Sequence, residues 1–344
     1  MQVQSMRPVK TFTIGFHEDG YNEADYASSV ARHLGTDHTE LFVTAHEAMQ
    51  VIPRLASIYD EPFGDSSAIP TFLVSQLARR HVTVALSGDG GDELFCGYAR
   101  YQRTNDIWSL MRRVPYVARK AVSLGLGALS CRWRTASARA RTARLAQYLV
   151  SKNAAAVYQA QMTQRFDAHE LVMCNGEGLR ESAPDAAFSP EDIYPNMMCM
   201  DASTYLPDDI LVKVDRASMA VGLEARVPML DYRVVEFAWH LPMHLKLGGR
   251  TRKWLLKQVL RKYLPDSLLE RRKMGFGVPV GEWVRGPLRE WAESLLSEER
   301  LRREGLLNPK LVREQWTGHL AGYSGGSDSL WHVLAFQAWL ASVA

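Results

Sequence analysis

An acid-rich glycine turn is the stretch of this sequence best equipped for chemistry. The β-branched run VTVALS (82–87) predicts a buried strand, and it leads directly into GDGGDE (88–93). Glycine has no Cβ, so backbone N–H groups at such a turn can approach a ligand closely. Three carboxylates would repel a bare phosphate, and a divalent cation such as Mg2+ is therefore their natural complement. A helix N-terminus also favours acids, but that alternative explains one of them rather than three.

Strands and helices alternate over the first hundred residues. The expected strands are 11–16, 38–43 and 82–87, and the expected helices are 22–35, 45–60 and 68–81. This alternation favours a parallel sheet covered by helices, and sheets of this kind bind ligands at the carboxyl ends of their strands. We therefore expect an α/β fold, with a parallel sheet and flanking helices over residues 9–106.

The rest of the chain is expected to be helical. We assign residues 107–195 to a basic helical insertion and residues 196–344 to a mostly helical carboxyl part. Between residues 107 and 166 the sequence has eleven Lys or Arg residues and no Asp or Glu. A tRNA or phospholipid surface could use such a face, although basic runs are more often simply solvated.

The composition is ordinary. The 344 residues are 47% hydrophobic and carry a net charge of +3, which does not by itself indicate a polyanionic partner. The four cysteines form no CxxC pair, and this spacing predicts reduced thiols rather than a zinc site or disulfides. No apolar run approaches the roughly 18 residues of a membrane span. We expect a cytoplasmic protein without a nucleic-acid partner.

Several stretches together resemble the synthetase domain of the asparagine synthetase family, the glutamine-hydrolysing type. Besides SGDGGDE they are TFTIGF, DEPFGDSSAIPTFLVSQLA, LPDDILVKVDRASMAVGLEARVPMLD (206–231) and RRKMGFGVPVGEWV (271–284). They follow the family's order and cover nearly the whole chain, most weakly over residues 107–195. The resemblance implies the adenine nucleotide α-hydrolase-like fold of the N-type ATP pyrophosphatases.

The resemblance also implies a reaction and its cofactors. The family uses ATP and Mg2+ to adenylate a carboxylate, and ammonia then attacks the acyl-adenylate. For asparagine synthetase the carboxylate is the aspartate side chain, the intermediate is β-aspartyl-AMP, and the ammonia comes from glutamine or from solution. Small-molecule substrates are thus implied.

Nucleotide and catalytic roles follow from the same resemblance. Ile14 falls on the strand whose backbone holds adenine, and Ser87 and Gly88 fall on the nucleotide-contacting turn. The implied catalytic residues are Asp89, where many members have Glu, and Lys273, which matches a lysine that neutralises charge on the α-phosphoryl group.

Two further acids receive roles in this way. Asp92 matches the acid next to the metal, which makes it the expected Mg2+ ligand, and Asp215 lies near the substrate. Taken singly, Asp215 reads equally well as a solvated helix acid paired with Lys213 or Arg216. The sequence FCGY departs from the commoner FGGY at Cys96, and we expect this to affect packing only.

The stretch SGGSDS (324–329) has the pattern of a pyrophosphate-binding loop, but its context differs. The preceding residues read as a helix end and a glycine turn rather than a strand, and LWHVLAFQAWL after it reads as a buried helix. We interpret the match as a coincidence, not as a circular permutation. The true loop would then lie upstream of Met1, as would the glutaminase domain, whose nucleophile is a cysteine. We interpret the chain as the carboxyl part of a longer synthetase, with a glutaminase domain or subunit acting in trans as one option.

Other interpretations stay open. The same fold serves other amide-forming enzymes, such as β-lactam synthetase-like cyclases and amidotransferases of polysaccharide clusters. A tRNA-modifying adenylating enzyme would use SGGSDS as its loop and the basic stretch for RNA. A remnant that binds a partner without turning over ATP is a non-enzymatic alternative.

Overall fold

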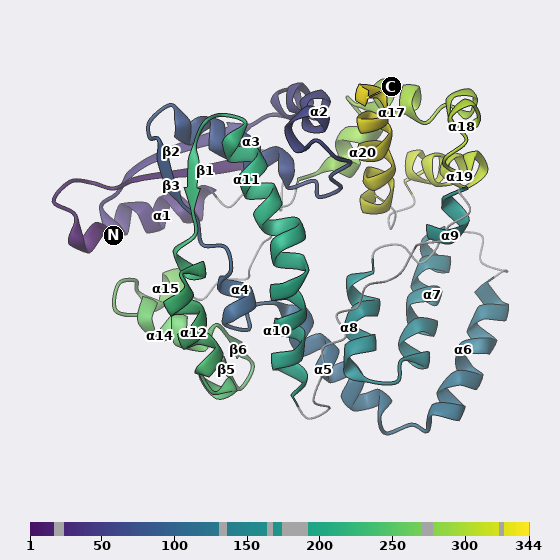
Figure 1. The fold of residues 1–344 in the computed structure, drawn as a ribbon, viewed down its shortest axis with the longest axis horizontal. Coiled ribbons are helices and arrows are strands. Elements are labelled where there is room, and N and C mark those ends of the chain that lie inside the picture. The colour runs from purple at the N-terminus through teal and green to yellow at the C-terminus, as the bar shows by residue number, and fades with distance from the viewer. Residues whose placement is uncertain are drawn as a thin grey trace. The chain divides into compact units, whose positions relative to one another are not determined.

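The structure is a computed structural model, and it describes residues 1–16, 24–130, 136–163, 168–173, 192–269, 278–322 and 327–343 (Figure 1). The chain groups into two compact units. The first comprises Met1–Gly97, Ala202–Trp283 and Ala338–Ala344, and the second comprises Tyr98–Asp201 and Val284–Gln337. Residues 284–337 thus group with the helices that follow residue 98. The division into 9–106, 107–195 and 196–344 stays a prediction.

The first unit opens with a parallel strand pair. Strand β1 (Lys10–Phe16) runs beside β2 (Asp37–Val43), in a register that pairs Lys10 with Asp37 and Phe16 with Val43. Helix α1 (Ala24–Leu34) connects the two strands. These elements confirm the strands and the helix predicted from TFTIGF, HTELFV and the segment between them. Apolar side chains at the end of the pair, Ile14, Phe16 and Val43, are buried.

Two helices lead to the second strand pair. Helix α2 (Ala45–Tyr59) begins with a capping box, in which the Thr44 hydroxyl accepts from the Glu47 N–H and the Glu47 carboxylate accepts from the Thr44 N–H. Helix α3 (Ala68–Arg79) follows and buries most of its apolar residues. Both helices were predicted from the sequence at nearly these bounds.

Strand β3 (Val84–Leu86) is shorter than the predicted run 82–87, and its partner comes from a distant segment. It pairs in parallel with β4 (Glu224–Arg226), Val84 opposite Glu224 and Leu86 opposite Arg226. Strand β4 was not predicted from the sequence, since Glu-Ala-Arg is short and polar and has no strand pattern of its own. The strands of this fold therefore do not all come from residues 9–106.

The two strand pairs are not joined. Across the described residues, β1 pairs with β2 and β3 pairs with β4, and no hydrogen-bonded ladder connects the pairs. Strand β3 leaves apolar side chains uncovered, with Val84 38% and Leu86 47% exposed. Exposed apolar residues on an unpaired strand edge are unusual for a finished sheet.

Short elements complete the first unit. They are η1 (Gln2–Gln4), α4 (Gly91–Leu94), the π-helical turn η2 (Leu206–Leu211), α11 (Val212–Met219), η3 (Pro228–Leu230), α12 (Tyr232–His240), α13 (Met243–Lys246), β5 (Leu247–Gly248), β6 (Thr251–Arg252), α14 (Trp254–Leu260), α15 (Asp266–Leu269) and α16 (Val280–Arg285), the last of which runs past Trp283. Helix α11 packs against α2 and α3.

The second unit is helical. Its elements are α5 (Ala99–Met111), α6 (Tyr116–Ser130), α7 (Ala136–Val150), α8 (Ala154–Met162), α9 (Ala168–Leu171), α10 (Ile193–Ser203), α17 (Arg289–Leu295), α18 (Glu298–Glu304), α19 (Pro309–Leu320) and α20 (Ser327–Val343), of which α10 and α20 extend beyond the unit. None of the helices in the described ranges is long and apolar enough to cross a membrane.

A buried carboxylate ties the second unit together. Asp201, 1% exposed, accepts from the Arg100 guanidinium at 2.6 Å, from the Tyr101 hydroxyl at 2.6 Å and from the Tyr158 hydroxyl at 2.6 Å. These three donors satisfy the carboxylate oxygens, and a polar group is tolerated at such a buried position only when it is hydrogen-bonded.

The second half of the SGGSDS stretch belongs to helix α20. Helix α19 ends at Leu320 and α20 begins at Ser327, while residues 323–326 lie outside the described part of the chain. No strand precedes the stretch within the described residues, and the described neighbour of β1 is β2. The structure gives no support to a circularly permuted sheet.

The glycine turn after β3 yields a stability test. Gly90 has a left-handed φ of 79°, and a Cβ there would overlap the Leu230 side chain. We expect Gly90→Ala to lower the free energy of unfolding by about 1–3 kcal/mol. Gly125→Ala, an exposed position in α6 with nothing near an added Cβ, should instead be neutral or stabilising. Urea unfolding of both variants measures this, and an equal loss in the two would contradict the assigned strain.

Candidate functional site

The candidate site begins where β3 ends. The Ser87 N–H donates to the Arg226 carbonyl at 2.9 Å and so continues the ladder between β3 and β4 by one residue. Beyond it the chain turns, and the Ser87 hydroxyl donates to the Asp89 carboxylate at 2.8 Å. A Cβ added at Gly88 would meet nothing within 4 Å, so the backbone at this residue faces open space. A ligand can therefore approach the main chain here.

The turn continues into the short helix α4, where an acid and a lysine meet. The Lys253 ammonium lies 3.1 Å from the Asp92 carboxylate, and their side chains are 30% and 19% exposed. The Gly97 N–H donates to the Asp92 carbonyl at 2.8 Å, and a Cβ at Gly97 would overlap the Asp92 carboxylate. Both charges are thus held at a partly solvated position beside the turn.

Lys253 is a site residue that the sequence analysis missed. It precedes α14 with a left-handed φ of 52°, a conformation that non-glycine residues adopt rarely and that clusters at functional sites. The neighbouring Arg252 guanidinium donates to the Gly97 carbonyl at 3.2 Å. No local pattern in TRKWLL marks either residue as a partner of the glycine turn.

Buried apolar side chains pack around the residues that follow the turn. Leu94 and Phe95 form a buried cluster with Ala238 of α12, against which Met229 and Leu230 pack. The next residue, Cys96, is fully buried with a left-handed φ of 53°, and burial raises the pKa of its thiol to about 12. The backbone conformation explains why glycine suits this position, and the thiol is not reactive.

A second feature lies between α11 and β4. Here Leu211, Val214 and Met219 line a depression of about 300 Å3 together with two acids, Asp215 and Glu224. The Glu224 carboxylate is already bound by the Arg226 guanidinium at 2.7 Å. The depression is therefore mainly apolar, and both of its carboxylates are exposed, that of Glu224 in the ion pair with Arg226.

The cations that could have neutralised Asp215 are engaged elsewhere. Lys213 binds Asp65 and Asp209, and the Arg216 guanidinium lies 3.3 Å from the Asp60 carboxylate. The pairing of Asp215 with either cation, which the sequence left open, is thus not the arrangement in the structure.

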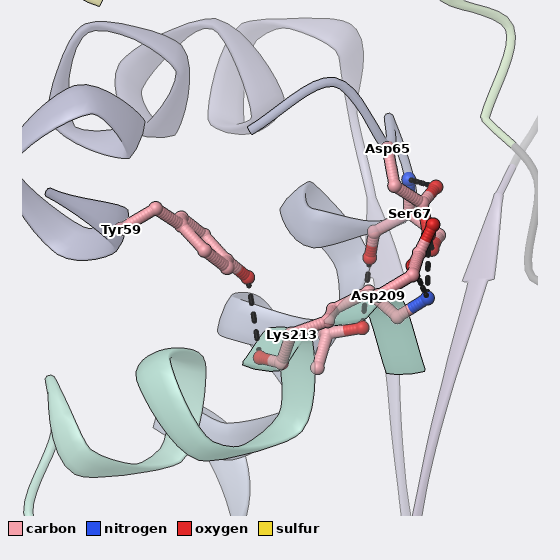
Figure 2. Close-up of polar contacts among 6 residues, drawn as sticks. Tyr59, Asp65, Ser67, Asp209 and Lys213 are labelled. Atoms are coloured by element: carbon pink, nitrogen blue, oxygen red, sulfur yellow. Dashed lines mark hydrogen bonds and ion pairs between the residues drawn. The ribbon is translucent and has the colours of Figure 1, made fainter. Parts of the chain in front are cut away.

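Lys213 is the centre of a polar network that joins α2, α3 and α11. Its ammonium lies 2.5 Å from the Asp65 carboxylate and 3.5 Å from that of Asp209, and its side chain is only 11% exposed. Figure 2 shows the side chain reaching toward both acids, while the Tyr59 hydroxyl donates to the Lys213 carbonyl at 3.3 Å. The Ser67 hydroxyl and N–H both donate to Asp65, at 2.7 and 2.9 Å.

The pKa values of the two acids in the network are shifted in opposite directions. Burial by itself would raise the pKa of Asp65, but the Lys213 ammonium and the Ser67 donors outweigh it and hold that pKa below its usual range. Burial, and after it the neighbouring Asp65 charge, together raise the pKa of Asp209 to about 6 against the opposing pull of Lys213. Asp65 is thus the ionised partner of Lys213, and Asp209 is the member that gains a proton in mild acid.

Of the other predicted site residues, the structure describes all but Lys273. Ser87, Gly88, Asp89 and Asp92 lie together on the turn, whereas Ile14 is buried in β1. Lys273 lies outside the described residues, so its proposed approach to the turn stays a prediction. Among the described residues no group of three or more His, Cys, Asp or Glu side chains forms a ready metal site.

Lys213 offers a matched pair of stability tests. We expect Lys213→Met to lower the free energy of unfolding by about 3 kcal/mol, because it leaves two partly buried carboxylates without their counter-charge. Arg216→Met, three residues along the same helix and in an exposed pair, should cost no more than about 1 kcal/mol. Urea unfolding at neutral pH compares them, and similar losses would contradict a central role for Lys213.

The pKa of Asp209 sets a pH test. Its folded value of about 6 exceeds the ordinary 3.8, so between these values the folded chain holds a proton that the unfolded chain has lost. The contribution of Asp209 to stability is therefore full below pH 3.8 and falls as the pH rises through about 6. The Asp209→Asn variant should gain stability relative to the unchanged chain as the pH rises across this window. Stability curves that stay parallel from pH 4 to 7 would contradict the assignment.

Comparison with known proteins assigns the family. The chain matches the asparagine synthase family over residues 1–341. It is 30% identical over 334 residues to asparagine synthetase [glutamine-hydrolyzing] 1 of Bacillus subtilis, covering 96% of this chain and 52% of that protein. It is 33% identical over 331 residues to a putative asparagine synthetase [glutamine-hydrolyzing] of Mycobacterium tuberculosis, covering 96% of this chain and 50% of that protein. The chain spans about half the length of these relatives, and it belongs to the asparagine synthase family.

Proposed function

We propose that this chain carries the ATP-dependent, AMP-forming half of an amide ligase, with aspartate converted to asparagine through β-aspartyl-AMP. The observation that supports this most is the glycine turn at the carboxyl end of β3. It combines open backbone at Gly88, two carboxylates at Asp89 and Asp92, and a cation at Lys253. Backbone donors and a balanced set of charges are what a nucleotide phosphate requires.

In this proposal each residue of the site has its own role. The backbone of Ile14 in β1 would hold adenine, and Ser87 and Gly88 would contact the nucleotide. Asp89 would orient the reacting groups, while Lys273 would neutralise the charge that grows as pyrophosphate leaves. Lys253, held beside Asp92, adds a second cation for the phosphates. Electrostatic stabilisation of this kind is the main lever in phosphoryl chemistry.

Asp92 is suited to Mg2+ in one respect. Proteins commonly hold this ion through one or two carboxylates and the phosphates of the substrate rather than through a full protein cage. The Asp92 carboxylate and the neighbouring Asp89 supply such oxygens on one turn. The bound ion would reduce the repulsion between these carboxylates and the phosphates of the nucleotide. The metal would supply charge neutralisation at the phosphates.

The carboxylate substrate is the least defined part of the proposal. Asp215, at the rim of the depression between α11 and β4, offers a negative group that would suit the amino group of an amino acid. Two relatives are named asparagine synthetase, which favours aspartate. A β-lactam synthetase-like cyclase or a polysaccharide-cluster amidotransferase would use another carboxylate at the same turn. The cytoplasm, where ATP and aspartate are available, is the compartment we propose.

The unjoined strand pairs support a role within a larger synthetase. We propose that β2, β1, a further strand, β3 and β4 form one parallel sheet in the complete enzyme, with the further strand bearing the pyrophosphate loop. The exposed Val84 and Leu86 would then be covered. A glutaminase domain or subunit would deliver ammonia, in keeping with the names and lengths of the relatives.

The activity test uses the 344-residue chain by itself. With Mg2+, ATP, aspartate and ammonia we expect slow pyrophosphate and AMP release or none, and no asparagine from glutamine. Loss of a single oxyanion donor costs about 10²–10³ in rate, and the strand between β1 and β3 would supply several. Binding of ATP with Mg2+ should nevertheless be measurable by calorimetry. Asp92→Asn should weaken it at least about tenfold, whereas Asp37→Asn on the exposed edge of β2 should not.

Each unexpected result would contradict a different part of the proposed function. Nucleotide binding that is absent, or equally strong in Asp92→Asn, would contradict the site. Rapid turnover that Asp328→Ala abolishes would show that SGGSDS is a working loop after all. AMP release that depends on a carboxylate other than aspartate would favour one of the related ligases.

A further inference from the structure

The hairpin of α6 and α7 buries a charged side chain at its centre. Arg119 is only 5% exposed, and its guanidinium donates to the carbonyls of Leu149 at 3.1 Å and Ser151 at 2.8 Å, at the end of α7. The Ser123 hydroxyl, one turn further along the same face of α6, donates to the Ala146 carbonyl at 3.1 Å. The side of α6 that faces α7 therefore carries polar contacts from Arg119 and Ser123.

The opposite side of α6 is apolar and uncovered. Val117 is 79% exposed and Leu124 is 68% exposed, and Ala121 lies between them. Residues at spacings of four and three share one face of a helix, so these side chains form a continuous stripe. An ordinary surface helix has the reverse arrangement, with its apolar side packed and its polar side solvated. A stripe of this kind indicates a face that something apolar covers.

Cations surround this stripe. Arg112 and Arg113, at the turn that leads into α6, and Lys120, one helical turn beyond Val117, are all exposed. The segment from residue 107 to residue 166 has eleven Lys or Arg residues and no acid. The partner must therefore offer negative charge next to an apolar layer.

We propose that the outer face of α6 docks on an anionic lipid surface, with Val117 and Leu124 entering the boundary between headgroups and acyl chains. Arg112, Arg113 and Lys120 would lie at the phosphate level, where each cation strengthens adsorption. The hydrogen bonds of Arg119 hold α6 on α7 and so keep the stripe facing outward. The chain would attach to the membrane from one side, through this face of α6.

Two other partners fit this face less well. A second copy of the chain would bring an acid-free basic face against its own like charges. A nucleic acid would use the cations but leave the Val117 and Leu124 side chains in water, because phosphates and sugars offer no apolar surface there. An anionic bilayer satisfies the stripe and the cations together.

Vesicle sedimentation with the full 344-residue chain tests the proposal. We expect binding to phosphatidylcholine vesicles that contain phosphatidylglycerol, weaker binding to pure phosphatidylcholine, and a decline as salt is added. Val117→Ser with Leu124→Ser should lower the partition coefficient about tenfold or more, because the stripe loses its transfer free energy. Arg112→Gln with Arg113→Gln should lower it about thirtyfold.

A matched control removes general effects of surface polarity. Val259 and Leu260 in α14 are 45% and 42% exposed, and Val259→Ser with Leu260→Ser should leave vesicle binding unchanged. Equal thermal melting of all three double variants would show that each remains folded. The proposal is overturned by equal binding to neutral and anionic vesicles, or by loss of binding in the control alone. Dimerisation or RNA binding through this face without vesicle binding would overturn it as well.

Discussion

The parallel pairing of Val84–Leu86 with Glu224–Arg226 is the constraint on which the candidate site depends. The pairing is only three residues long on each strand, yet it brings the glycine turn after β3 beside the segment that follows β4. As a result Leu230 lies against Gly90, and Ala238 of α12 packs with Leu94 and Phe95. So short a ladder is held in place by the segments that follow its strands, because Leu230 packs against the cluster of Leu94 and Phe95.

The Lys213 network adds contacts that hold α11 in place, which a ladder of three residues does not do by itself. A short turn joins α11 to β4, and Lys213 binds that helix to the loop before α3 through Asp65. The same helix then presents Asp215 on its other side, at the rim of the depression. Burying an ion pair stabilises a fold little compared with an apolar core, but it specifies one arrangement strongly, since a shift would leave the charges unpaired. We regard the network as the element that positions α11, with the proton on Asp209 adjusting its strength.

The sequence allowed the prediction of local features and not of those that depend on distant partners. TFTIGF, the helix expected over residues 45–60 and the glycine turn each have their own pattern, and the structure has them at nearly the expected bounds. Strand β4 could not be predicted because Glu-Ala-Arg becomes a strand only by pairing with β3. The spacing of Asp209 and Lys213 is a visible helical ion-pair pattern, but nothing in it points to Asp65. Lys253 has no local signal, since its role comes from the contact with Asp92 alone.

The account rests on the claim that the junction of β3 and β4 is where a nucleotide binds. Hydrogen–deuterium exchange of the chain with and without ATP and Mg2+ tests this most directly, because it locates binding even where turnover is slow. We expect added protection at residues 87–94 and at the segment 227–231, with little change in α6 and α7. Protection confined to the helical residues 98–201, or none at the glycine turn under saturating nucleotide, would contradict the account.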